Sequence, residues 1–138
     1  MLIMKRVLSL FVVVLALAVA FSASAGEFAD LSKKVTDARD ALVTFLNDKD
    51  KRGEDQQKLV KDTADAVSAA LSSMKAPAGK EAQFKELADT WNAFKKTREE
   101  EIVPLTLQGK DEEAKTISGS AQKERFGKII ALCAELDK

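Results

Sequence analysis

Apolar residues recur at spacings of three and four through most of the chain after residue 26, which is the period of an amphipathic helix and not of a strand. The pattern is most regular in the first segment, where the apolar seam consists of Phe28, Leu31, Val35, Ala38, Leu42 and Phe45. Three further segments carry stripes of the same spacing, over 60–74, 84–94 and 126–136. No segment alternates at period two with β-branched residues, so the sequence predicts helices alone.

Three polar or glycine-containing breaks divide this pattern into four helices. They are the charged run 47–53, the segment Ala76-Pro77-Ala78-Gly79, and the turn at Gly109. We therefore expect helices over approximately 27–50, 54–75, 80–108 and 111–137, with a kink in the third at Pro104. Because loops this short join antiparallel neighbours, the predicted fold class is all-α, an up-down-up-down four-helix bundle formed by residues 26–138.

The first 25 residues have the three parts of a secretory signal peptide. Lys5 and Arg6 supply positive charge, an apolar run follows over 7–20, and Ala23-Ser24-Ala25 supplies the small residues of a cleavage site. We expect a signal peptide over 1–25, cleavage after Ala25, and a periplasmic location for the mature chain. The alternative is an uncleaved segment that anchors the chain to the inner membrane, although the apolar run is short for a span of about 20 residues.

Composition excludes several classes of function. The 22 basic and 22 acidic residues leave no positive surplus for phosphate backbones, so nucleic acid is not an expected partner. The chain has no histidine and no tyrosine, which rules out Ser-His-Asp triads, Glu-x-x-His di-iron sites and Cys-x-x-Cys-His haem attachment. No glycine-rich phosphate loop or EF-hand pattern is present. We therefore expect no enzymatic activity, no metal site and no cofactor.

The single cysteine, Cys133, cannot form an internal disulfide. It lies in the apolar stripe of the last segment, between Ile129 and Leu136, which favours a small buried hydrophobic residue. The alternative is a disulfide between two chains.

Arg98 is the charged residue that the pattern singles out. The seam of the third segment runs through positions 84, 87, 91 and 94 and places Arg98 where a hydrophobic residue is due. A hairpin that turns near residue 109 would put Arg98 opposite 121–122, about one helical turn from Ser118. Because a guanidinium group suits a carboxylate or phosphate, this position predicts an anchor for a small organic anion between helices. The alternative is that Arg98 reaches the surface or pairs with an acidic side chain. Trp91, on the same face, either walls this pocket or packs in the core, and Thr63 on the second segment is a further candidate ligand.

The second hairpin resembles a known family, the four-helix-bundle periplasmic sensor domain of methyl-accepting chemotaxis receptors. The likeness rests on an aromatic stripe, a glycine turn and a closing apolar stripe: Phe84, Trp91, Phe94, Gly109, Ala114, Phe126, Ile129, Ile130 and Leu136. The resemblance implies a non-enzymatic sensor bundle that binds a small organic ligand. Family members commonly dimerise through the first helix, so it also implies a homodimer along the 28–45 seam, or docking onto a membrane protein. No ligand residue of the family is carried over to a matching position.

The sequence thus predicts a periplasmic, non-enzymatic binding module for a small organic anion. Family members continue into a second transmembrane helix and a signalling region, whereas this sequence ends at Lys138, so we expect a free-standing module. The alternative function is a structural or interaction protein, such as a periplasmic chaperone or an adaptor of an envelope complex. Its contact surface would be an apolar patch on the first helix near Val43 and Leu46.

Overall fold

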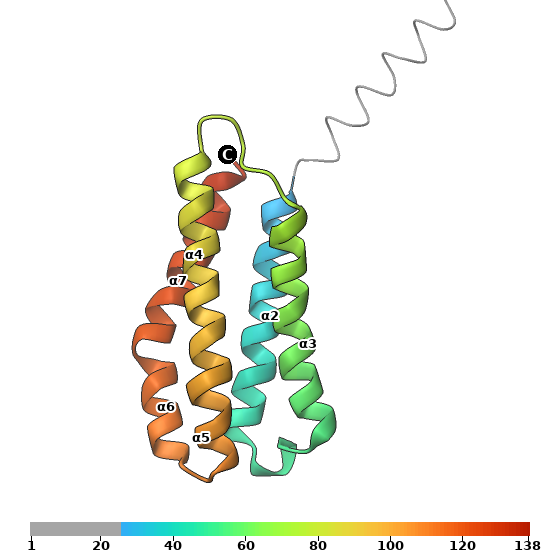
Figure 1. The fold of residues 1–138 in the computed structure, drawn as a ribbon, viewed down its shortest axis with the longest axis vertical. Helices are drawn as coiled ribbons and strands as arrows, with labels where there is room; N and C mark the ends of the chain where they lie inside the picture. Colours follow the sequence, from blue (N-terminus) through green and yellow to red (C-terminus); the bar gives the residue numbers. More distant parts are fainter. Residues whose placement is uncertain (1–25) are drawn as a thin grey trace, which may run out of the picture.

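The computed structural model describes residues 26–138 (Figure 1), so the signal peptide expected over 1–25 lies outside the described residues. Within 26–138 the chain forms four long helical segments and no strand. The predicted all-α class with four helices is therefore confirmed. None of the helices in this part of the chain is both long and apolar enough to cross a membrane.

The helical segments lie lengthwise beside one another, and consecutive segments are joined at alternate ends in Figure 1. In chain order the elements are α2 (Glu27–Asn47), the 3₁₀ turn η1 (Lys49–Lys51), α3 (Glu54–Ser73), α4 (Glu81–Thr97), the π-helical turn η2 (Arg98–Ile102), α5 (Val103–Leu107), α6 (Asp111–Gly119) and α7 (Ala121–Leu136). Helix α3 packs along α2, and α4 packs along α7, while α2 and α7 join the two pairs. The turn between α5 and α6 depends on Gly109, whose φ of 77° is unfavourable for residues with a side chain.

The fourth segment is not the continuous helix expected over 111–137. It breaks at Ser120, where φ is −105° and ψ is −111°, and separates α6 from α7. Gly119 precedes the break, and the low helix propensity of the run 118–120 explains why the helix is interrupted there.

The distortion of the third segment lies before Pro104 and not at it. The N–H of Val103 donates to the carbonyl of Arg98, which is the i to i−5 bond of a π turn. Pro104 follows in the first turn of α5, where its missing N–H is tolerated. The wider turn absorbs an extra residue, so Arg98 and Ile102 both point into the bundle, where both are fully buried.

The core divides into two clusters along the bundle axis. The larger one surrounds Trp91 and includes the first half of the α2 seam, together with Ile129 and Cys133 of α7. The smaller one contains Phe45, Val60 and Ile102. Every residue of the 28–45 seam is buried inside the bundle, so this seam is not a free surface for a second copy of the chain.

Candidate functional site

Arg98 lies between the two core clusters, and its side chain has 0% exposure. Its Nη1 donates to the carbonyl of Ala38 on α2 at 3.0 Å, and its Nη2 donates to the carbonyl of Val60 on α3 at 3.1 Å. The guanidinium group therefore points away from α6 and α7 and ties the π turn to the other pair of helices. Arg98 neither reaches the surface nor forms a salt bridge within residues 26–138, so neither part of the alternative considered for it describes the structure.

The positive charge of Arg98 is poorly compensated. Burial lowers the pKa of its guanidinium group from 12.5 to about 10, although the charge of nearby Glu99 acts in the opposite direction. The group is still a cation at neutral pH. Its Nε is buried and has no hydrogen-bond partner in the described part of the chain. A buried cation without a carboxylate is costly and therefore unusual in a core.

Two other predicted site residues, Thr63 and Trp91, form hydrogen bonds within the helical bundle. The hydroxyl of Thr63 donates within α3, to the carbonyl of Leu59 at 2.7 Å and that of Val60 at 3.2 Å. Thr63 and Arg98 thus share the Val60 carbonyl. Trp91 is fully buried, and its Nε1 donates to the Ser68 hydroxyl at 3.0 Å, so the ring is part of the core.

Ser118, the fourth predicted residue, lies in a separate groove between α2 and the α6–α7 segment. We call this hollow the α2–α6 groove. It has a volume of about 390 Å³ and is lined by Arg39, Leu42, Val43, Leu46, Asn47, Phe94, Ile102, Lys115, Ser118, Gly119, Gln122, Lys123 and Phe126. It exists because α7 packs against α2 while α6, beyond the break at Ser120, approaches α2 at fewer positions.

The α2–α6 groove is apolar at its floor and cationic at its rim. Leu42, Leu46 and Ile102 are buried floor residues. Every charged lining residue is basic, namely Arg39, Lys115 and Lys123. Such a surface favours a molecule with an apolar body and a negative group.

Side-chain contacts fix the shape of this groove. The Arg39 guanidinium carbon lies 4.7 Å from the centre of the Phe126 ring, so the cation covers part of the apolar wall. The Gln122 amide is buried, donates to the Phe94 carbonyl at 2.9 Å and accepts from Arg125 at 2.8 Å. Neither lysine of the rim forms a salt bridge within 26–138. The charges of Lys115 and Lys123 are therefore available to a ligand, whereas Arg39 lies 3.9 Å from the Asp40 carboxylate.

The structure thus separates the four predicted site residues. Arg98 and Thr63 meet at the Val60 carbonyl, Trp91 is in the core, and Ser118 lines the α2–α6 groove. Sequence reasoning missed the three basic residues of the rim. One available signal was that the segment 115–123 contains two lysines and no acidic residue. The apolar stripe of the fourth segment is also interrupted there, so fewer side chains fill the space beside it.

No group of three or more acidic or cysteine side chains within residues 26–138 is arranged to hold a metal ion. Cys133 is buried, and burial together with the charge of Asp137 raises the pKa of its thiol to about 11. A thiol of this kind is a poor nucleophile and a poor metal ligand at neutral pH. Comparisons of the chain with protein-family models, with curated proteins and with solved structures find no match.

Proposed function

We propose that the protein is a periplasmic, non-enzymatic binding module that holds a small amphiphilic organic anion in the α2–α6 groove. In this proposal the mature chain is an up-down-up-down four-helix bundle, released after cleavage of residues 1–25. The observation that carries the proposal is that every charged residue lining the groove is basic, above a floor that includes Leu42, Leu46 and Ile102. A monoanionic carboxylate with a short aliphatic or aromatic body has the matching chemistry.

The two parts of the groove make different contributions to binding. Each methylene group of a ligand that leaves water for the apolar floor contributes about 0.8 kcal/mol, which is about fourfold in Kd. Each exposed ion pair at the rim contributes roughly 0.2–1 kcal/mol. The apolar body therefore supplies most of the affinity, while the rim selects the sign of the charge.

The sensor-like role follows from the same site and from the resemblance of the second hairpin to chemoreceptor sensor domains. The α2–α6 groove lies between the two helix pairs, because α2 belongs to one pair and α6–α7 to the other. A ligand there would change how the pairs pack. A membrane protein that contacts both pairs could respond to this change, and such a protein is the partner that we propose.

Isothermal titration calorimetry with carboxylates of increasing length tests the proposal. We expect Kd to fall by about fourfold per methylene from butyrate to octanoate and then to level off when the groove is full. Octylamine and octanol, which have the same tail, should bind much more weakly than octanoate. Equal binding of the amine and the carboxylate, or no dependence on chain length, would contradict the proposal and favour the protein-binding role.

A charge variant locates the site. The triple substitution Arg39→Gln, Lys115→Gln and Lys123→Gln should raise the Kd for octanoate by about tenfold, if each rim contact contributes about 0.5 kcal/mol. The matched control changes three exposed lysines elsewhere, Lys33→Gln, Lys58→Gln and Lys85→Gln, with the same change in net charge. If the control lowers affinity as much as the rim variant does, the effect is one of overall charge and the α2–α6 groove is not the site.

A further inference from the structure

A second hollow, which Arg98 lines, lies between α3 and the α4–η2 segment. We call it the α3–α4 groove. It has a volume of about 640 Å³ and is lined by Gln57, Lys58, Val60, Lys61, Asp65, Lys95, Arg98, Glu99 and Val103. It has no lining residue in common with the α2–α6 groove.

Arg98 carries more hydrogen-bond donors than the bundle uses. A guanidinium group has five N–H donors. Two of them reach the Ala38 and Val60 carbonyls, and Nε has no partner within 26–138 although it is fully buried. Leaving a buried charged donor unsatisfied is among the more costly features that a core can carry. The unsatisfied donor belongs to a residue that lines the α3–α4 groove.

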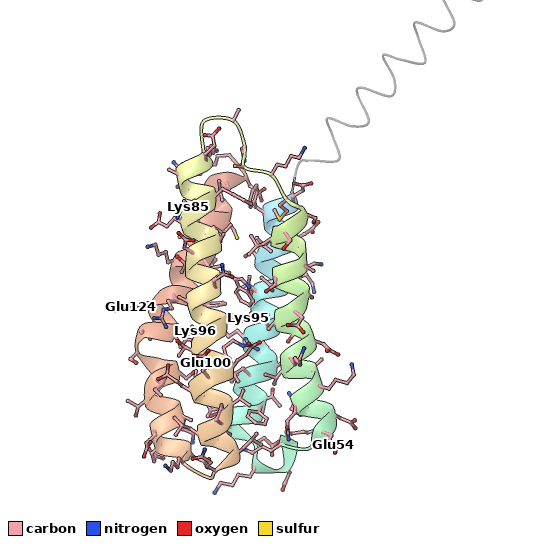
Figure 2. All side chains as sticks on the ribbon, in the orientation of Figure 1. Glu54, Lys85, Lys95, Lys96, Glu100 and Glu124 are labelled. Carbon is pink, nitrogen blue, oxygen red and sulfur yellow. The ribbon has the colours of Figure 1, made fainter. Side chains whose placement is uncertain are left out.

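The acidic residues of this groove are engaged with lysines and not with Arg98. Asp65 accepts from Lys61 at 2.6 Å on its own helix and from Lys95 of α4 at 3.1 Å across the groove. Lys95 also lies 3.8 Å from Glu99. In Figure 2 Lys95 is seen on the side of α4 that faces α3. Because these pairs are partly exposed, each contributes little, and rearranging Lys95 to admit a small molecule costs little.

We propose that Arg98 is the anchor of a second site, in which a small hydrophilic carboxylate of the size of acetate enters the α3–α4 groove and accepts from Nε. The planar edge formed by Nε and one Nη matches the two oxygens of a carboxylate. The ligand also supplies the negative charge that the core lacks at this point. Lys95, released from Asp65, faces the same anion from the rim. The two grooves bind different classes of ligand in these proposals. The α2–α6 groove binds an anion with an apolar body, whereas the α3–α4 groove binds a small hydrophilic anion that needs no apolar floor.

Thermal unfolding in sodium acetate tests this second site. We expect acetate at saturation to raise Tm by about 5–10 °C over sodium chloride at the same ionic strength, whereas neutral acetamide should have no effect. Arg98→Met should abolish the acetate shift while the far-ultraviolet circular dichroism spectrum remains helical. Lys33→Met, which changes an exposed lysine of α2 outside this groove, should keep the shift. An acetate shift that persists in Arg98→Met, or its absence in the unsubstituted protein, overturns the proposal.

A second measurement does not depend on the folding of the variant. The Nε–H proton of Arg98 in the unsubstituted protein can be followed by nuclear magnetic resonance during an acetate titration. We expect this signal to move downfield and saturate, as the donor gains an acceptor. The triple rim variant of the α2–α6 groove should behave identically, which separates this site from the proposed function. A signal that does not respond to acetate would overturn the assignment.

Discussion

Replacing Arg52 with methionine should destabilise the bundle by removing the cap of α2. Arg52 lies in the loop between α2 and α3, and its side chain is only 15% exposed. Its Nε donates to the Phe45 carbonyl at 2.9 Å, and its Nη2 donates to the Leu46 carbonyl at 2.7 Å. These carbonyls belong to the last turn of the helix, which has no further N–H groups of its own to offer them. Its Nη1 also pairs with Asp111, at the start of α6, at 3.0 Å.

The size of this destabilisation can be worked out from the two hydrogen bonds that Arg52 donates to the backbone carbonyls. A hydrogen bond from a charged donor contributes about 1.5 kcal/mol at the low end of its range, and partial exposure reduces the sum of the two to about 2 kcal/mol. For a domain of this size the loss corresponds to a decrease in Tm of about 8 °C. Arg52→Lys keeps the charge but cannot reach both carbonyls with a planar fork, so it should lose about half as much.

Thermal unfolding followed by circular dichroism measures these changes in Tm, with Lys51→Met as the matched control in the same turn.

The pH dependence of Tm gives a second check. Arg52 holds the pKa of the Asp111 carboxyl group below its usual value of 3.8, so the ion pair stabilises the fold above that pH. The stabilisation is lost as the pH falls through the lowered pKa of Asp111. The difference in Tm between the unsubstituted protein and Arg52→Met should therefore become smaller in acid. An Arg52→Met protein that unfolds at the same temperature as the control would refute the reasoning.

Two further predictions concern the larger core cluster. Ser68→Ala should cost about 1–2 kcal/mol, measured by denaturant unfolding, because it leaves the buried Trp91 Nε1 without its acceptor, whereas Ser72→Ala on the same helix should cost little. The Cys133 thiol should react with a disulfide reagent at neutral pH only as fast as the protein unfolds, since the side chain is buried and its pKa is raised to about 11. Rapid labelling of the folded protein would show that α7 opens locally.

The fold was predictable because its main signal is local. An apolar seam at spacings of three and four must be buried, and all six seam residues of α2 are in fact buried. Glycine and proline likewise end helices through their effect on the backbone of the adjacent residues. These signals establish the number of helices and their approximate ends without any knowledge of the neighbours.

The π turn of the third segment was not predicted, because it depends on which residues of this segment are buried against the neighbouring helices. The buried positions of the third segment, Leu87, Trp91, Phe94, Arg98, Ile102 and Thr106, are separated by four residues after position 94. A regular α-helix with this repeat drifts off its buried face, and the π turn compensates for the drift. The repeat was visible in the sequence, but Pro104 offered a simpler local cause for a distortion of this segment.

The site was less predictable for a different reason. Arg39, Lys115 and Lys123 come from two segments far apart in the chain, and each alone has the appearance of a solvated helix face. Only the packing of α2 beside the broken α6–α7 segment brings them to one rim. In the same way, the position of Arg98 on the inner face followed from spacing, whereas the direction of its guanidinium group was decided by the carbonyls of Ala38 and Val60.

A titration of the ¹⁵N-labelled protein with octanoate would show residue by residue whether the α2–α6 groove binds an amphiphilic anion. We expect the backbone amide signals of the groove to shift and saturate together, namely those of Val43, Ser118, Gly119 and Gln122. Signals of the exposed face of α3 should remain unchanged. Shifts that spread evenly over the bundle, or that never saturate, would contradict the claim.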